Sequence, residues 1–284
     1  MKGFTVHDLK LRLLGFPKED AYKIDDSILA GAVADGVTRD CANGSPLRKT
    51  PSGLLSALFF YPRFSNPAGT VSKWVVSEFL GNLKDSENKD EKAIYNAIKA
   101  ANEAAKIYND FNFPNPDFLV NDLAGCTFAG AVRDHKQGAL HWGYICDSGV
   151  AILDDKGNLK FKTDDDGPAK HDPLIWSDER LQELTWSDPK ARYTVRRYHR
   201  NNIIEPSFGV INGQPGAMDY VITGTHELTP EDSVLIYTDG LENIMFENGD
   251  IRGEFADVLS TQDCKQIKRF CAQRVKSEGT LIYE

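Results

Sequence analysis

The sequence predicts an α+β fold in which helices cover sheets built from short strands. Short apolar segments bounded by turn residues indicate strands, and two long segments with apolar residues at every third or fourth position indicate helices. Runs of strands separated by long helices are typical of a sheet sandwich covered by helices. The chain has 284 residues, 41% of them hydrophobic, which is enough for a packed core. We therefore expect a single domain spanning residues 1–284.

The first half of the chain predicts a hairpin, a helix pair and a meander. Segments 21–24 and 28–34 flank a turn at Asp25 and Asp26, and the second segment is apolar throughout, which is typical of a buried strand. Helices are expected over about 70–83 and 91–108, and we expect them to pack antiparallel. Four short strands should then form a meander, at 126–132, 140–145, 150–153 and 159–161.

The second half is less regular. Segment 164–202 is polar, with helix signals over 173–184 and 188–199. The remaining expected elements are strands at 219–225 and 233–238, a helix over about 261–276, and a last strand at 280–283.

Composition excludes several classes of function. The net charge is −9, and the sequence has no basic run that could follow a nucleic-acid backbone, so nucleic acid is not an expected partner. No apolar stretch approaches the roughly 18 to 20 residues that cross a bilayer, and the start lacks an apolar signal region, which predicts a cytoplasmic protein without a membrane partner. The cysteines argue against a disulfide framework because they are odd in number and scattered: Cys41, Cys126, Cys146, Cys264 and Cys271.

Acidic residues stand at the ends of the apolar strands. Glu19 and Asp20 precede the first hairpin, Asp35 ends its second strand, and Asp239 follows a later strand. Carboxylates beside buried strands need compensation for lost hydration, and a hard divalent cation can supply it. Oxygen ligands favour magnesium or manganese over zinc. Taken singly, Asp35 before Gly36 is more often a turn, and Glu19 with Asp20 is more often a solvated loop.

Taken together and in order, these segments resemble the type 2C protein phosphatases. The similar segments span nearly the whole chain: Glu19-Asp20-Ala21, the apolar strand 32–37 that ends in Asp-Gly-Val, Gly125-Cys126-Thr127, Cys146-Asp147-Ser148-Gly149, Ser207-Phe208-Gly209, and 232–241 with its Thr-Asp-Gly-Leu end. Order and extent make this resemblance more specific than any one motif.

The resemblance implies a four-layer α-β-β-α sandwich, with two central antiparallel sheets flanked by helix pairs. It also implies a metal-dependent phosphatase in which Asp35 bridges two Mn²⁺ or Mg²⁺ ions and is the central catalytic residue. Glu19, the Gly36 carbonyl and Asp239 would complete the metal shells. Asp20 is a secondary ligand candidate, and Asp147 could help to hold a third ion.

By the same resemblance, two metal ions activate a water that attacks phosphorus without a phosphoenzyme intermediate. The implied substrates are a phosphoserine or phosphothreonine protein, or a small phosphoester.

Two departures from the family pattern concern the phosphate and the last metal ligand. The family often has an arginine shortly before Glu-Asp; here the nearest cations are Arg12 and Lys18, and Arg39 is a further candidate for binding phosphate. The family also has an Asp-Asp or Asp-Asn pair near its last strand. Glu278 is the local match and so a possible replacement ligand, unless the acidic pair is absent from this chain.

The sequence also suggests two other interpretations. Cys41 and Arg48 suggest a cysteine-based phosphatase loop, but six residues separate them where that chemistry needs five. A catalytically inactive regulatory or scaffold module that keeps the phosphatase fold is the main alternative, and the departures above motivate it.

Overall fold

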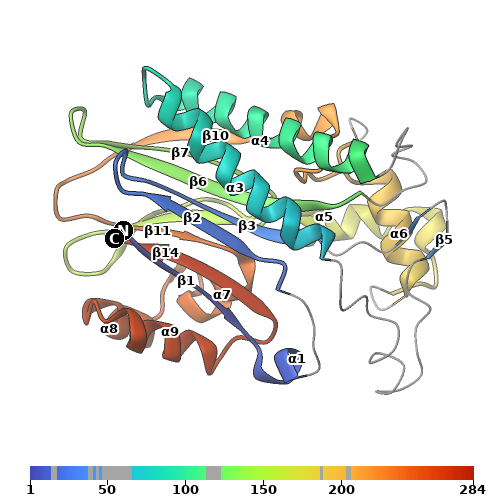
Figure 1. The fold of residues 1–284 in the computed structure, drawn as a ribbon. Coiled ribbons are helices and arrows are strands. Elements are labelled where there is room, and N and C mark those ends of the chain that lie inside the picture. The colour runs from blue at the N-terminus through green and yellow to red at the C-terminus, as the bar shows by residue number, and fades with distance from the viewer. Residues whose placement is uncertain are drawn as a thin grey trace.

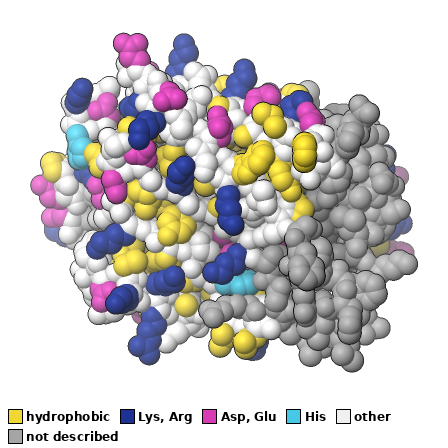
Figure 2. All heavy atoms as spheres, in the orientation of Figure 1, with side chains coloured by type: hydrophobic (Ala, Val, Ile, Leu, Met, Phe, Trp, Pro, Cys, Tyr) yellow, Lys and Arg dark blue, Asp and Glu magenta, His cyan; other side chains and the backbone are white. Residues whose placement is uncertain are grey.

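The computed structural model describes residues 1–13, 18–37, 41–42, 45–46, 66–112, 123–185, 188–202 and 206–284. Two five-stranded sheets pack face to face, with helices on both outer faces (Figure 1). The predicted four-layer α-β-β-α sandwich is therefore confirmed. Acidic and basic side chains are interspersed on the face shown in Figure 2. No helix among the described residues is long and apolar enough to span a membrane.

Each sheet is antiparallel at every pairing between its strands. The first sheet has the order β10 (Ile222–Glu227), β7 (Ala139–Ile145), β6 (Gly125–Asp134), β3 (Ala30–Val37) and β2 (Ala21–Asp25). The second has the order β1 (Lys2–His7), β14 (Glu278–Tyr283), β11 (Ser233–Tyr237), β8 (Gly149–Leu153) and β9 (Leu159–Lys162). Two short hairpins pair β4 (Cys41–Ala42) with β5 (Ser45–Pro46), and β12 (Phe246–Glu247) with β13 (Asp250–Ile251).

The first sheet is covered by the predicted helix pair, α3 (Pro67–Asp85) and α4 (Glu91–Asn112). Helix α3 begins where the Asn66 side chain accepts a hydrogen bond from the Gly69 N–H and proline occupies the first turn, a favourable helix start. Its apolar stripe packs on the sheet, where Phe79 meets Phe128 edge-on at a centroid distance of 4.9 Å.

The second sheet is covered by three short helices: α7 (Asp239–Met245), α8 (Gly253–Ser260) and α9 (Cys264–Ala272). The prediction of one helix over 261–276 was wrong in its bounds. Helix α8 ends at Ser260, and Asp263 caps a new helix by accepting hydrogen bonds from the Lys265 and Gln266 N–H groups. Helix α7 and strand β1 were not predicted.

The expected hairpin 21–34 is confirmed as β2 and β3. The meander prediction needs a correction, because β6 and β7 lie in the first sheet whereas β8 and β9 lie in the second. The chain crosses between sheets at Cys146–Ser148. Apolar side chains from both sheets fill the space between them, and the list includes Val33, Ala129, Val150, Ile236 and Ile282.

The polar segment 164–202 folds as α5 (Pro168–Ile175), a 3₁₀ turn η1 (Glu179–Leu181) and α6 (Pro189–Tyr198), beside the sandwich end (Figure 1). Two further short helices are α1 (Leu9–Leu13) and η2 (Pro215–Tyr220). A buried amide joins α4 to two other parts of the chain. The Asn109 side chain on α4 donates hydrogen bonds to the carbonyl of Ala124, just before β6, and to the carbonyl of Asn212, just before η2. Cys126, Cys146, Cys264 and Cys271 are free thiols.

Candidate metal centre

Four of the predicted aspartates come together at one end of the sandwich. The register that pairs Ala21 with Ala34 brings Asp20 beside Asp35. Asp147 lies where the chain crosses from β7 to β8, and Asp239 opens α7 directly after β11. The charges of Asp20, Asp147 and Asp239 all act on Asp35. Strand ends from both sheets therefore converge on one acidic cluster.

Two glycines make this convergence possible. Gly36 lies inside β3 and not in the turn that the alternative interpretation expected. A Cβ at Gly36 would lie 2.6 Å from the Glu19 carbonyl oxygen, so the segment before β2 approaches only because this side chain is absent. A Cβ at Gly240 would collide with the carbonyl oxygen of Glu278 at the start of β14.

Threonine hydroxyls fix Asp20. The Oγ1 atoms of Thr238 and Thr280 each donate a hydrogen bond of 2.9 Å to Asp20 Oδ2. The second oxygen, Asp20 Oδ1, is buried and has no hydrogen-bond partner. The carboxylate is thus held by one oxygen, and the other is left available to a ligand.

One carboxylate oxygen of Glu278 accepts hydrogen bonds from the backbone. Its Oε2 accepts hydrogen bonds from the N–H groups of Glu19, at 2.7 Å, and Asp20, at 3.3 Å. Its Oε1 is buried without a hydrogen-bond partner. Glu278 therefore holds the 19–20 segment against the second sheet, and one of its oxygens still has capacity for a ligand.

The pKa values of the clustered carboxyls are raised above those of exposed carboxyls. Burial, with the negative charges of Asp20 and Asp239, raises the pKa of Asp35 well above its ordinary value. Burial, opposed in part by hydrogen bonds to Asp35 and the two threonines, raises the pKa of Asp20 to about 6. Burial and the charges of Asp239 and Asp165 raise the pKa of Asp147 to about 7.

Burial and negative charge also raise the pKa of Glu278. Burial, followed by the charge of Asp20, raises the pKa of Glu278 to about 8, although hydrogen bonds from two backbone amides oppose the shift. Without a cation, these groups would hold protons at pH values where an exposed carboxyl is ionised.

The donor set fits a hard divalent cation. Every candidate ligand is an oxygen, and three buried carboxyl oxygens lack hydrogen-bond partners: Asp20 Oδ1, Asp147 Oδ1 and Glu278 Oε1. Within the described ranges, however, no three His, Cys, Asp or Glu side chains already surround a common point as metal ligands do. The carboxylates would therefore have to draw together around a bound ion.

The other predicted site residues are less well placed. Arg39 lies outside the described residues, as does the side chain of Arg12, whose backbone belongs to α1. Half of the 41–48 loop, including Arg48, also lies outside them. Glu19 is partly buried at the edge of the cluster.

The sequence interpretation missed Thr238 and Thr280. The available signal was a threonine directly after one strand, beside Asp239, and a threonine inside another strand, beside Gly279. Such a residue can donate a hydroxyl to a neighbouring carboxylate.

Comparisons with solved structures agree with this architecture. The catalytic domain of the serine/threonine protein phosphatase PstP, in complex with two manganese ions, has a TM-score of 0.59 at 15% identity, covering 99% of this chain and 95% of that one. The chain has the fold of the type 2C Ser/Thr phosphatases. A bacterial serine phosphatase gives a TM-score of 0.59 at 15% identity, covering 100% and 96%.

The phosphatase MsPP from Mycobacterium smegmatis, a Ser/Thr phosphatase solved with cacodylate, has a TM-score of 0.53 at 15% identity, covering 100% and 97%. No protein-family profile matches the chain, and no curated protein matches it significantly. The likeness to the type 2C phosphatases is thus one of fold, and the family resemblance of the motifs rests on the residues themselves.

Proposed function

We propose that this protein is a metal-dependent phosphatase that hydrolyses phosphoserine or phosphothreonine in proteins, or another phosphomonoester. The observation that carries the proposal is the cluster of buried carboxyls with unpartnered oxygens at one end of the sandwich. A fold shared with a phosphatase that binds two manganese ions supports it. The single-domain organisation and cytoplasmic location remain predictions.

The proposed ligand set consists of oxygens only. Asp35, Asp239, Glu19 and the Gly36 carbonyl are the residues that would hold two Mn²⁺ or Mg²⁺ ions. Asp20 and Glu278 each offer one free oxygen, and Asp147 is the candidate for a third ion. When bound, such a pair of cations supplies an activated water and stabilises negative charge on the phosphoryl group, which makes a phosphoenzyme unnecessary.

The chain's own residues prepare this chemistry by positioning. Thr238 and Thr280 hold the Asp20 carboxylate by one oxygen, so that its orientation is set before any ion arrives. Glu278 ties the backbone of Glu19 and Asp20 to β14. Arg39 and Arg12 remain the sequence-based candidates for holding the phosphate.

Hydrolysis of para-nitrophenyl phosphate tests the proposal. We expect activity with Mn²⁺ or Mg²⁺ and none with a chelator, because the acidic cluster needs a cation to act. Asp35→Asn and Asp239→Asn should each reduce kcat by roughly 10³-fold or more, as loss of a metal ligand usually does. Asp154→Asn, in an exposed turn, is the matched control and should retain activity. Activity that survives Asp35→Asn would refute the assignment.

The inactive regulatory module is the second candidate, and one observation favours it. Glu278, the substitute for the family's last acidic ligand, already uses one oxygen on backbone amides. Calorimetric titration with Mn²⁺ of the native protein and of Asp35→Ala separates the two candidates. Heat of binding that depends on Asp35 supports the enzyme, and its absence supports the regulatory module.

A further inference from the structure

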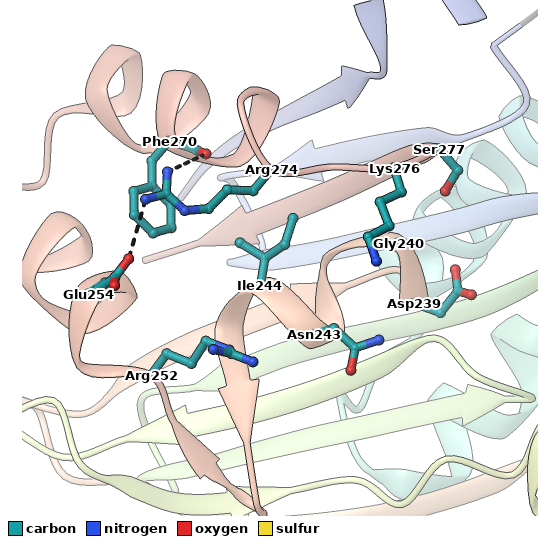
Figure 3. Close-up of a pocket in the computed structure, with 10 residues that line it drawn as sticks. All are labelled: Asp239, Gly240, Asn243, Ile244, Arg252, Glu254, Phe270, Arg274, Lys276 and Ser277. Atoms are coloured by element: carbon teal, nitrogen blue, oxygen red, sulfur yellow. Dashed lines mark hydrogen bonds and ion pairs between the residues drawn. The ribbon is translucent and has the colours of Figure 1, made fainter. Parts of the chain in front are cut away.

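A cavity of about 500 Å³ opens beside the acidic cluster, between α7, α8 and the segment that joins α9 to β14 (Figure 3). Asp239 and Gly240 form one end of it, with Ser277 and Lys276. The rest of its lining comes from the covering helices and their connections: Asn243, Ile244, Arg252, Glu254, Phe270 and Arg274. The cavity thus begins at a proposed metal ligand and extends away from it.

The lining is basic, in a protein whose net charge is −9. Arg252, Arg274 and Lys276 supply three positive charges against the carboxylates of Asp239 and Glu254. If Asp239 binds a cation, as proposed above, its charge is neutralised from the other side and the cavity becomes more positive. A basic cavity in an acidic protein is a local arrangement that attracts an anion.

The three cations are not committed to strong partners within the described part of the chain. Arg274 contacts Glu254 at 3.3 Å, but that glutamate side chain is 77% exposed. Arg252 contacts Glu247 at 3.4 Å, and that glutamate is 58% exposed. Exposed pairs of this kind contribute little and exchange readily. Lys276 is exposed and has no ion-pair partner among the described residues.

The positively charged groups are distributed along the length of the cavity. The Arg274 guanidinium lies 3.7 Å from the centroid of the Phe270 ring, which fixes its plane at the far end of the cavity. Figure 3 shows the Arg252 side chain reaching toward Asn243 in the middle, and Lys276 extending between Ile244 and Asp239. Positive groups therefore follow the cavity from the proposed metal centre outward.

We propose that this cavity binds an anionic group of the substrate, so that the protein prefers phosphopeptides with an acidic residue or a second phosphate beside the phosphorylated residue. Lys276 lies nearest the reacting phosphate, and Arg274 and Arg252 bind the flanking anion. Arginine suits carboxylate and phosphate because it donates two parallel hydrogen bonds. This proposal rests on the proposed phosphatase function and adds a substrate class to it.

The test measures binding separately from hydrolysis. Fluorescence anisotropy is recorded with Mn²⁺ and the full-length protein on three peptides that carry a non-hydrolysable phosphonate in place of phosphoserine. The three differ in one flanking residue, which is glutamate, a second phosphonate analogue of phosphoserine, or glutamine. We expect the first or second peptide to bind roughly tenfold more tightly than the glutamine peptide, the size of one or two charge-assisted hydrogen bonds.

Variants of the cavity cations test whether these residues cause the preference for a flanking anion. A double variant, Arg274→Gln with Lys276→Gln, should reduce the preference to within about twofold. Lys268→Gln is the matched control, because Lys268 is an exposed cation on the preceding helix α9 that does not line the cavity. Both changes lie at exposed positions, and circular dichroism verifies that each variant folds.

The outcomes distinguish this proposal from the one on which it rests. Equal binding of all three peptides, or an equal loss of preference in Lys268→Gln, would overturn the anion site. A preference that disappears only in the double variant supports it. Matched peptides with ordinary phosphoserine then test hydrolysis: binding preference without hydrolysis would overturn the phosphatase function and leave the anion site intact.

Discussion

The two ends of strand β11 differ in whether the carboxylates there have a positively charged partner. Asp232, just before the strand, is buried and paired: its Oδ2 contacts Lys160 at 2.6 Å and accepts the Thr229 N–H at 2.8 Å. Beyond the other end lies Asp239, in a cluster where Asp20, Asp35 and Asp147 repel one another. Asp239 itself is exposed, but Asp20 behind it is buried as Asp232 is, and only Asp232 has a positively charged partner.

The difference indicates where an external cation belongs. At the Asp232 end, Arg133 also contacts Glu284 at 2.9 Å and donates to the Thr229 carbonyl at 2.9 Å, so the charges there are balanced by the chain itself. At the Asp35 end, carboxyl oxygens are left without partners. Several mutually repelling carboxyls gathered without a cationic partner are typical of a functional site.

The largest expected loss of stability comes from adding a side chain at Gly240, where α7 packs closely against β14. Gly240→Ala places a Cβ against the Glu278 carbonyl, and we expect it to destabilise the protein by about 3 kcal/mol or more, because backbone atoms cannot yield as side chains can. Chemical denaturation measures the loss. Gly253→Ala is the control, since nothing lies within 4 Å of a Cβ there. Equal stability of the two variants would contradict this packing of α7 on β14.

Removing the charge at the paired end should be the next largest effect. Asp232→Asn leaves Lys160 without its carboxylate, and we expect a loss of about 2 kcal/mol in the free energy of unfolding. Urea denaturation with and without Mn²⁺ measures it, and the loss should be the same in both conditions. A loss that depends on metal would show that the two ends are not independent.

The same kind of substitution at the unpaired end should have the opposite sign. Asp147→Asn removes a buried negative charge from a repelling group, so we expect the metal-free protein to gain about 1 kcal/mol in stability. With Mn²⁺ present, the native protein should gain more from the ion than the variant does. Thermal unfolding of both proteins, with and without Mn²⁺, tests this. Destabilisation of the metal-free variant would indicate that Asp147 has a favourable partner.

The smallest effect is the pH dependence, which should differ in direction between the ends. Folded-state pKa values of about 6, 7 and 8 for Asp20, Asp147 and Glu278 lie above those of the unfolded chain. Their stabilising contribution is complete below the unfolded pKa and is lost as pH rises through these values. The melting temperature of the metal-free protein should therefore fall between about pH 5 and about pH 9.

At the Asp232 end the sign reverses. Burial alone would raise the pKa of Asp232, but hydrogen bonds from Lys160 and the Thr229 N–H bring it below the ordinary value. Its contribution is present above the unfolded pKa and is lost as pH falls through the folded one. In Asp232→Asn, the loss of stability on acidification should be smaller than in the native protein. An unchanged acid limb would contradict the pairing.

Much of the fold could be predicted because its signals are local. The apolar run 28–34 and the helical spacing in α3 and α4 each specify an element without reference to the rest of the chain. The helix predicted over 261–276 corresponds to α9 alone, which is shorter because the Asp263 cap starts it at Cys264, and α8 was not predicted. The exchange of β8 to the second sheet has no local signal at all.

The site could be predicted in its residue types and only partly in its geometry. Asp20, Asp35, Asp147 and Asp239 were chosen from strand ends and from the family resemblance, and the structure does bring them together. The role of Glu278 as a hydrogen-bond acceptor for backbone amides could not be read, because its partners are 259 and 258 residues away. The basic cavity was missed because Arg252 lies just before α8 whereas Arg274 and Lys276 lie between α9 and β14, and only the fold brings these two connections together.

The span of these contacts has a consequence for biosynthesis. Thr280 orients Asp20, and Glu278 holds the backbone of residues 19 and 20. The acidic cluster therefore joins a segment that is synthesised early to one that is synthesised late. Contacts of such long range form late, after the cost in chain entropy of closing a large loop. A ribosome-bound chain that lacks β14 would leave Asp20 without this hydroxyl and the 19–20 amides without their acceptor. The cluster would thus assemble only after synthesis has passed Thr280, and we expect a nascent chain to lack the activity proposed for the finished protein.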